Sequence, residues 1–350
     1  MAFEVKDISY NIENEIESVT SLLEKHNLKL DSFVEKTIGV YEQDLLIATG
    51  SIAGNTLRSI CIDEEYRGTS VINTLVSHLL NLLYDLSCTH FFIYTGVDAY
   101  RSFIKLGFHL VIKLESGIVL MENKANGIQD YLKEIKNITS NRETCEKPII
   151  GSIVINGNPF TNGHRHLIDL AKEHCDLIYI FVVWEENSVF PNEVRYRLIE
   201  EGISDLNGIV LCKGENYIIS SATFPTYFLK DVSESVQQHA ILDLTIFRDI
   251  IAPYLGITKR FIGEERLCET TNIYNQTMIK LMEGSPITVT EIKRKESDNE
   301  IISASHVRRY IKENKWSEIK KVVPKTTYDF LNSKGAEPII AKISNSSSRH

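Results

Sequence analysis

From Pro148 onward, runs of almost unbroken apolar residues alternate with segments that have helical spacing. The apolar runs occupy 148–156, 176–184, 208–214, 259–264 and 286–294. Runs of this kind are typical of strands buried on both faces of a parallel sheet. Helical patterns lie between them, at 164–175, 192–206, 237–255 and 271–284. The alternation therefore predicts an α/β domain with a helix-covered parallel sheet over residues 148–340.

The preceding part of the chain has a different pattern. Residues 1–122 mix strand pairs with helices, which predicts an α+β domain. Polar residues dominate 123–147, but Ile128, Leu132 and Ile135 keep a helical period there, so we expect a linker helix. Residues 341–350 end in a run rich in serine and are expected to form a disordered tail.

Composition excludes some classes of function. The net charge of −9, without a basic tail, argues against a general nucleic-acid or anionic-membrane binder. No stretch approaches the roughly 18 apolar residues of a membrane span. The six cysteines are scattered without a C-x-x-C pair, so neither a zinc site nor a disulfide framework is predicted. Together with the acidic N-terminus, these features predict a cytoplasmic protein without a resident metal.

The first chemically informative motif, at 158–164, follows the first strand of the parallel-sheet domain. It reads Asn-Pro-Phe-Thr-Asn-Gly-His and leads into a helix. Ligands of open α/β sheets bind at the carboxyl ends of strands, and a helix start offers free N–H groups to a phosphate. We expect Gly163 to allow close approach, and Thr161 and His164 to donate hydrogen bonds to phosphate oxygens.

A second motif, at 302–308, lies near the other end of the same domain and reads Ile-Ser-Ala-Ser-His-Val-Arg. Ser303 and Ser305 stand at a predicted helix start, which also suits a phosphate. Arg308, one turn into the helix, supplies a cation with several donors in a fixed geometry. Either motif alone also fits an ordinary capped helix, but the two in this order at opposite ends of a βα array are a much stronger signal.

Together, the two motifs resemble the T/H-x-G-H and I-S-x-S/T-x-x-R motifs of the nucleotidyltransferase superfamily, whose domains are Rossmann-like. The resemblance narrows to the citrate lyase ligase family over roughly 148–330. It rests on INGNPFTNGHRHLIDLA, LIYIFVVWEENSVFPNEVRYRLI, IISSATFPTYFLKD and ILDLTIFRDIIAPYLGITKRFIGEE, and on the TNIYNQTM helix.

The citrate lyase ligase resemblance implies a reaction. ATP and acetate would form acetyl-AMP and pyrophosphate, with Mg²⁺ as the metal partner of ATP. The acetyl group would then pass to the thiol of the phosphoribosyl-dephospho-CoA group on the carrier subunit of citrate lyase. Two rivals share the motifs: a nucleotidyltransferase that adenylylates a small molecule such as pantetheine phosphate, and a non-catalytic nucleotide-binding regulator.

The resemblance also implies roles for individual residues. Thr161, His164 and Arg308 would be the catalytic residues, with Thr161 and His164 at the α-phosphate. The leaving pyrophosphate would contact Ser303, Ser305 and Arg308. The ATP site would further include Asn158, Phe160, Gly163 and Arg195, and the turn Gly263, Glu264 and Glu265 near the ribose or base.

The N-terminal domain resembles the GNAT acetyltransferase family over roughly 1–120. The resemblance rests on EYRGTS before a long predicted helix and on AYRSFIKLGF. In that family, a loop of pattern R/Q-x-x-G-x-G/A binds the CoA pyrophosphate. Arg67, Gly68 and Thr69 begin the corresponding loop, but Ser70 and Ile72 replace its later glycines, so we expect no use of free acetyl-CoA. Docking of the carrier's CoA-like arm and a purely structural role both stay open.

Overall fold

The computed structural model divides the chain into two compact units, Met1–Asp130 and Tyr131–His350. It describes residues 3–31, 33–139, 147–186, 188–225, 234–265, 268–298 and 300–345. Within these ranges, no helix has both the length and the apolar character needed to cross a membrane. Each unit is built around its own sheet, and each is described separately below.

Unit 1 is an α+β unit around a seven-stranded sheet of order β1-β2-β3-β4-β5-β7-β6. Only β4 and β5 pair in parallel, and their ladder covers two residue pairs, Thr56↔Phe92 and Leu57↔Ile93. The strands are β1 (Glu4–Asp7), β2 (Lys36–Glu42), β3 (Leu45–Ala53), β4 (Thr56–Ile62), β5 (Phe92–Gly96), β6 (His109–Lys113) and β7 (Ile118–Glu122). The helices are α1 (Glu13–Lys25), η1 (Glu64–Tyr66), α2 (Val71–Asp85) and α3 (Tyr100–Lys105).

The core of unit 1 forms where α2 covers the sheet. Leu75, Leu79 and Leu83 recur at helical spacing and are fully buried. They join a cluster that includes Ile38, Val40 and other residues of β2 and β3. The amphipathic pattern of this segment therefore decides which face of α2 packs on the sheet.

Unit 2 contains a five-stranded, all-parallel sheet of order β10-β9-β8-β11-β12. Its strands are β8 (Ile150–Ile155), β9 (Leu177–Val182), β10 (Ile209–Lys213), β11 (Lys259–Gly263) and β12 (Thr288–Ile292), and a small hairpin joins β13 (Glu296–Ser297) to β14 (Glu300–Ile301). The order confirms the predicted fold class, a Rossmann-like parallel-sheet domain preceded by an α+β domain.

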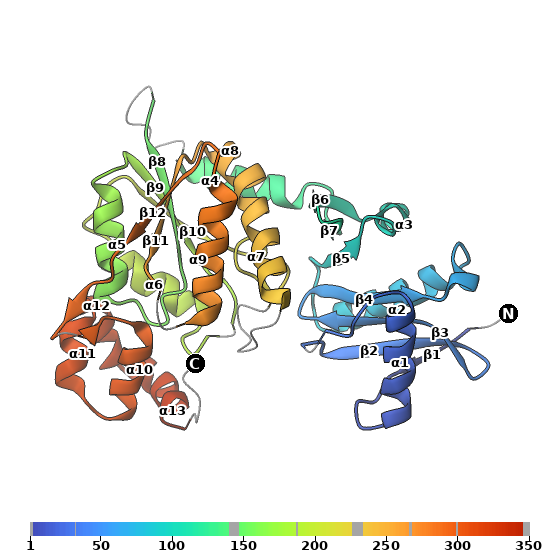
Figure 1. Cartoon of the computed structure of the whole chain (residues 1–350). Helices are drawn as coiled ribbons and strands as arrows, with labels where there is room; N and C mark the ends of the chain where they lie inside the picture. Colours follow the sequence, from blue (N-terminus) through green and yellow to red (C-terminus); the bar gives the residue numbers. More distant parts are fainter. Residues whose placement is uncertain are drawn as a thin grey trace. The chain divides into compact units, whose positions relative to one another are not determined.

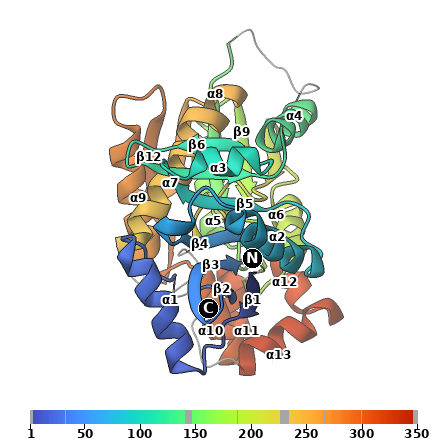
Figure 2. The same cartoon turned by 90° about the vertical axis from the view of Figure 1, so that its right-hand side faces the viewer.

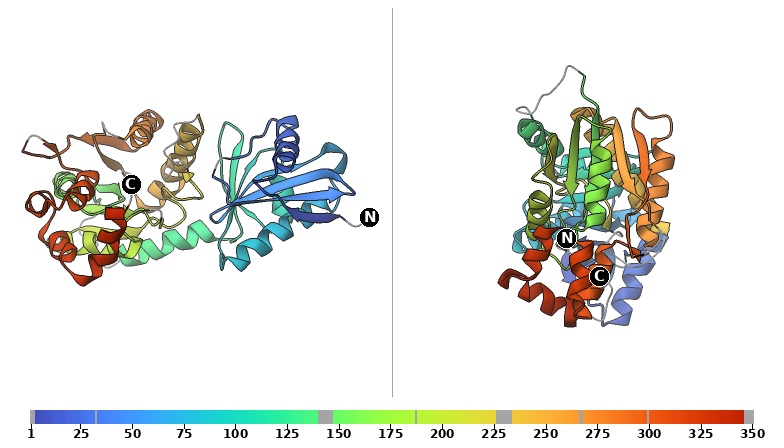
Figure 3. Two further views of the ribbon diagram at one scale, coloured as in Figure 1. Left: turned by 90° about the horizontal axis from the view of Figure 1, so that it is seen from below. Right: turned by 90° about the vertical axis from the view of Figure 1, so that its left-hand side faces the viewer.

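Helices cover both faces of the parallel sheet (Figures 1 and 3). On one face, α5, α6 and the C-terminal helices share a core with Ile153, Ile178 and Ile180. On the other, α7 and α9 lie side by side (Figure 2), and Phe247 packs edge-on to Phe181 of β9. The helices are α4 (Gly127–Thr139), α5 (Asn162–Lys172), α6 (Asn192–Gly202), α7 (Glu234–Ile246), η3 (Phe247–Ile251), α8 (Ala252–Leu255), α9 (Glu269–Met282), α10 (Ala304–Lys312), α11 (Trp316–Val322), α12 (Lys325–Leu331), η4 (Lys334–Ala336) and α13 (Glu337–Asn345).

The segment predicted as a linker helix is more closely integrated than a spacer would be. From Tyr131 on, α4 packs on the parallel sheet of unit 2. The Tyr131 hydroxyl donates to the Lys213 carbonyl at 2.9 Å, and Thr139 Oγ1 lies 3.0 Å from the Tyr179 hydroxyl. These contacts tie α4, from Tyr131 on, to β10 and β9 of unit 2. Residues 140–146 of the predicted linker lie outside the described residues.

The C-terminal boundary predicted from the sequence needs a correction. Residues 341–350 were expected to be a disordered tail, but α13 continues to Asn345. Ile343 in its last turn is buried in the same core as Ile339. The folded part of the chain therefore extends past the predicted boundary at residue 340, because Ile343 packs in the core. Residues 346–350 lie outside the described residues.

We expect Ile343→Ala to lower the free energy of unfolding by about 2 kcal/mol, since it removes buried methyl groups. Lys342→Ala, at the exposed neighbouring position, should change it by less than about 0.5 kcal/mol. Urea denaturation of both variants measures this difference. Equal stabilities for the two variants would contradict the placement of Ile343 in the core.

Candidate active site

The centre of the parallel sheet contains a point where neighbouring strands separate. β8 and β11 are adjacent, yet their ladder covers only Gly151↔Lys259 and Ser152↔Arg260, near the start of each strand. The next strand along the chain from β8 is β9, on its other side. Such a switch point leaves a crevice at the carboxyl ends of the strands, where open α/β sheets bind their ligands. The two predicted phosphate motifs meet at this edge.

The first motif forms the N-terminus of α5. Thr161 is the N-cap residue, and its Oγ1 accepts a hydrogen bond from the backbone N–H of His164. In return, the Thr161 backbone N–H donates to His164 Nδ1 at 3.0 Å. A nitrogen that accepts a hydrogen bond carries no proton, so a neutral His164 ring must carry its proton on Nε2. The capping geometry thus makes Nε2 the donor of the His164 side chain.

His164 is held in its neutral form. Burial, followed by the positive charge of Arg294, lowers the pKa of His164 to about 4. Phe160 stacks on the ring with centroids 5.7 Å apart and is itself fully buried. At neutral pH, His164 therefore presents an uncharged N–H donor, which stabilises developing negative charge without adding a mobile proton.

The structure gives Gly163 a different reason from the one predicted. A Cβ atom at this position would lie 3.0 Å from the carbonyl oxygen of Ile302. A side chain at this position would crowd that carbonyl, because the first turn of α5 packs against the first residue of the second motif. The contact brings the two motifs together, although they are far apart in the chain.

The second motif forms the N-terminus of α10. Ser303 is the N-cap residue and accepts from the backbone N–H of His306 at 3.2 Å. Arg308 Nη2 donates to Ser305 Oγ at 3.2 Å, and Nη1 donates to the Asn158 carbonyl. Burial lowers the pKa of Arg308 to about 10, so it remains a cation at neutral pH. Arg308 therefore joins the second motif directly to the first.

Asn158 has a positioning role in this geometry. Its Oδ1 accepts a hydrogen bond from the Phe190 backbone N–H at 3.0 Å, while its carbonyl receives Arg308. The loop after β8 is thereby tied both to the segment after β9 and to α10. Asn158 thus fixes the loop that leads to Thr161, and the buried Phe160 stacks on the His164 ring.

The turn after β11 is held by Arg294, a residue not predicted from the sequence. Gly263 ends this strand, Glu264 and Glu265 follow it, and the Gly263 carbonyl accepts from Asn275 Nδ2 of α9 at 3.1 Å. Arg294, which follows β12, donates from Nε to the Glu264 carbonyl at 2.5 Å and forms an ion pair with Glu265. The available signal was the basic run at 293–295 directly after the last predicted strand.

Arg195 does not belong to the phosphate site. Its side chain is fully buried, and its guanidinium donates to the backbone carbonyls of Asn156, Val183, Glu185 and Phe190. These carbonyls lie in the loops that follow β8 and β9. A guanidinium occupied in this way has no geometry left for ATP, so the predicted role of Arg195 is corrected to organising the two loops.

The family-specific segment at 218–231 is held by a second buried group that the sequence analysis did not select. Asp243 of α7 accepts from the Ile219 N–H at 2.6 Å, from Thr223 Oγ1 at 2.7 Å and from the Tyr274 hydroxyl at 2.7 Å. Burial raises the pKa of Asp243, and the three donors oppose that shift. Residues 226–231 of this segment lie outside the described residues.

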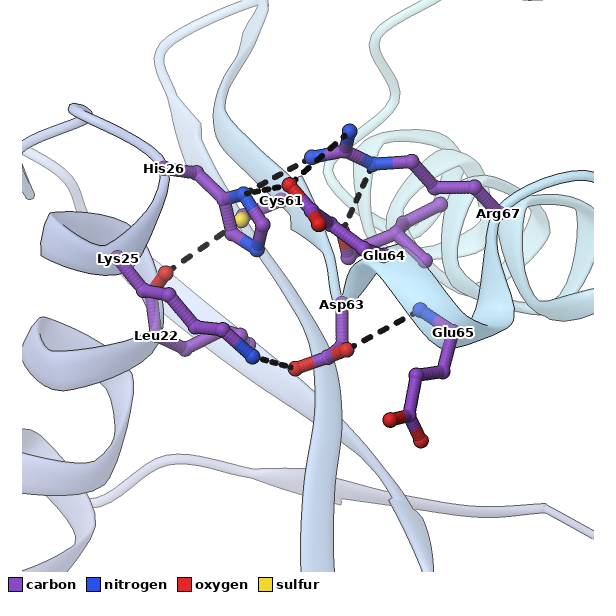
Figure 4. A network of polar contacts seen from close by, with 9 residues as sticks. Leu22, Lys25, His26, Cys61, Asp63, Glu64, Glu65 and Arg67 are labelled. Carbon is purple, nitrogen blue, oxygen red and sulfur yellow. Dashed lines mark hydrogen bonds and ion pairs between the residues drawn. The ribbon is translucent and has the colours of Figure 1, made fainter.

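In unit 1, the three residues predicted to begin a phosphate loop follow η1. Arg67 turns toward α1: its Nη2 lies 2.9 Å from His26 Nδ1, and Glu64 lies within 3.7 Å (Figure 4). Gly68 has a φ of +80°, and Thr69 Oγ1 donates to the Tyr66 carbonyl at 2.6 Å. Ile72 packs on the core of unit 1. These contacts within the unit occupy Arg67 and favour a structural role for the loop.

A parallel sheet with this switch point, and with two capped helix starts joined across it, defines a nucleotidyltransferase-type domain. The profile described as the citrate lyase ligase C-terminal domain matches residues 150–331. A citrate (pro-3S)-lyase ligase from Haemophilus influenzae is 39% identical over 325 residues, covering 91% of this chain and 95% of that protein. One from Escherichia coli is 39% identical over 320 residues, covering 90% of each chain. The chain belongs to the citrate lyase ligase family.

Among solved structures, Thermotoga maritima TmcAL bound with alpha-thio ATP shares 13% sequence identity at a TM-score of 0.38. The match covers 55% of this chain and 57% of that chain. The family membership of this chain therefore rests on the sequence matches and not on this structural similarity.

We expect Arg195→Met to lower the free energy of unfolding by at least about 3 kcal/mol, because several buried carbonyls lose their donor at once. Arg197→Met, at an exposed position of the same helix, is the matched control and should be close to neutral. Thermal and urea denaturation compare the two. A stable Arg195→Met variant with weakened ATP binding would return Arg195 to the phosphate site.

The low pKa of His164 should appear in the pH dependence of stability. Between about pH 6.5 and pH 4, the unfolded chain binds a proton at this position that the folded chain does not. The free energy of unfolding should therefore fall as the pH falls through this window, by up to about 1.4 kcal/mol per pH unit. His164→Gln should remove this component. A difference between the two proteins that does not vary with pH would contradict the shifted pKa.

Proposed function

We propose that this protein is an ATP-dependent ligase that activates acetate and acetylates the carrier subunit of citrate lyase. The observation that carries the proposal is the junction of the two capped helix starts at the β8–β11 crevice, where Arg308 donates to the Asn158 carbonyl. Membership of the citrate lyase ligase family supports the carrier subunit of citrate lyase as the acceptor of the acetyl group. The product would be citrate lyase in its acetyl form, made from the inactive thiol form.

The reaction has two steps. In the first, an acetate oxygen forms a bond to the α-phosphorus of ATP, and the bond from this phosphorus to the bridging oxygen breaks. Pyrophosphate leaves, and acetyl-AMP remains. In the second, the sulfur of the phosphoribosyl-dephospho-CoA group attacks the acetyl carbonyl carbon, the thiol proton is released and AMP departs. Positioning and charge stabilisation dominate such chemistry, because the protein forms no bond of its own.

The motif residues have distinct roles in the first step. His164 Nε2–H would serve the α-phosphate, whose oxygens gain charge in the transition state, and the buried Thr161 would orient it, since its Oγ1 lies 2.9 Å from His164 Nδ1. Ser303, Ser305 and Arg308 serve the leaving pyrophosphate, and the N–H groups at both helix starts contribute partial positive charge. Gly163 allows the two helix starts to approach each other, and the Gly263–Glu265 turn borders the ribose or base.

Mg²⁺ is proposed as the metal partner of ATP. The two capped helix starts offer N–H and O–H donors, which suit phosphate oxygens rather than a metal ion. Mg²⁺ commonly keeps several waters and takes its remaining ligands from substrate phosphates. Bound in this way, it would neutralise charge on the departing pyrophosphate, while the residues of the chain hold the α-phosphate.

A reducing cytoplasm is the proposed compartment. The described cysteines, Cys61, Cys88, Cys175, Cys212 and Cys268, form no disulfide with one another. Burial raises the pKa of Cys61 to about 11 and also raises that of Cys175, so neither forms a thiolate readily. Cysteines without disulfides are typical of proteins in a reducing compartment.

ATP–pyrophosphate exchange tests the proposal. Exchange should require acetate and Mg²⁺, because pyrophosphate can return only after a mixed anhydride has formed. His164→Ala should lower the exchange rate by about 10²–10³ with a smaller effect on ATP affinity.

Exchange with pantetheine phosphate in place of acetate would support the adenylyltransferase rival, and ATP binding without turnover would support the regulator. Acetate-dependent transfer of label to a citrate lyase carrier subunit, and not to a carrier with its thiol blocked, tests the second step.

A further inference from the structure

Arg294 is held rigidly at the crevice by two neighbouring groups. It follows β12, the neighbour of β11, and its Nε and Nη2 are occupied by the Glu264 carbonyl and the Glu265 carboxylate. Glu265 is itself fixed, because its Oε1 accepts from the Cys268 backbone N–H at 3.0 Å near the start of α9. A guanidinium bonded along one edge to a fixed turn cannot swing freely into solvent.

The chain next to Arg294 contacts the second motif, which in turn lies against the first. Within the described ranges of the chain, no hydrogen-bond partner is seen for Arg294 Nη1, and the side chain remains 22% exposed. The backbone next to it leads directly to the two motifs: the Lys295 carbonyl accepts from Ile302 N–H at 3.0 Å, and the Ile302 carbonyl would lie 3.0 Å from a Cβ at position 163. The Arg294 charge also acts on the His164 ring.

Arg195 and Arg308, the other two arginines described above, differ from Arg294 in this respect. Arg195 is fully buried among carbonyls, and Arg308 is only 7% exposed and bonded to Asn158 and Ser305. A phosphate group that entered the crevice beside His164 would meet Arg294 as a partly exposed cation with an available N–H edge. Guanidinium groups bind phosphate oxygens with two parallel hydrogen bonds more readily than ammonium groups do.

We propose that Arg294 is a further catalytic residue of the adenylation site: anchored after β12 by Glu264 and Glu265, it contacts the α-phosphate through its Nη1 edge. This inference rests on the proposed function. It gives the α-phosphate one fixed cation in addition to the uncharged donors of the first motif. It also explains why Glu265, an acidic residue at a site for an anionic ligand, is tolerated: its charge is paired with the arginine that it orients.

Three variants of the full chain test the role of Arg294. Arg294→Gln should lower kcat for acetate-dependent ATP–pyrophosphate exchange by about ten- to a hundredfold, and should raise the pKa of His164 above its value of about 4. Arg294→Lys should keep the low pKa of His164 but recover only part of the rate, because an ammonium cannot reproduce the planar fork. Arg309→Gln, at an exposed position of α10, is the control and should change neither quantity.

The pKa of His164 is followed by the ring NMR signals of histidine-labelled protein without ATP, so this readout does not depend on turnover. Glu265→Gln separates contact from anchoring, since it keeps the Arg294 charge and weakens only its anchor. It should lower the rate less than Arg294→Gln does and leave the His164 pKa low.

Each outcome distinguishes the two proposals. An active wild-type chain together with an Arg294→Gln variant of unchanged rate and unchanged His164 pKa would overturn the role of Arg294 alone. Equal rate losses in Glu265→Gln and Arg294→Gln, with the His164 pKa unmoved in both, would reduce Arg294 to a structural anchor and also overturn it. Absence of acetate-dependent exchange in the wild-type chain would instead remove the proposed function.

Discussion

The hydrogen bond from Arg308 to the Asn158 carbonyl is the interaction on which the site depends. It joins α10 to the loop after β8, across 150 positions of the chain. The start of α5 and the start of α10 each supply hydrogen-bond donors, and this bond brings the two sets of donors together at the crevice. The approach of the Ile302 carbonyl to Gly163 reinforces the same junction. A glycine and an arginine thus hold two segments together that are far apart in the chain.

Burial distinguishes three arginines of unit 2, Arg195, Arg308 and Arg294. Arg195, fully enclosed, satisfies carbonyls that would otherwise be buried without a donor. Arg308 is nearly as buried, but part of its bonding is to the second motif, so it both joins the loops and places a cation beneath them. Arg294, bonded to Glu264 and Glu265, stays 22% exposed. The number of backbone acceptors around an arginine therefore decides whether its guanidinium is fully used within the chain or keeps donors for a ligand.

His164 illustrates how local structure sets chemistry. The capping exchange with Thr161 directs Nδ1 into the helix start and leaves the proton on Nε2. Burial then lowers its pKa, so that the ring stays neutral across the physiological range. A neutral donor suits a phosphate whose charge rises only in the transition state, because it does not bind the ground state as strongly as a cation would.

The sequence alone determined the fold class and the location of the two phosphate motifs. Alternating apolar runs and helical periods are local signals, and so are Ser303 and Thr161 as helix-capping residues, since each depends on neighbours within a few positions. The family resemblance likewise rests on contiguous segments. Only the tertiary structure decided that Arg195 is enclosed, that Gly163 accommodates Ile302, that Ile343 belongs to the core and that Arg294 is anchored by Glu264 and Glu265. These properties depend on how many distant atoms surround a side chain, and desolvation of that kind leaves no periodic trace in the sequence.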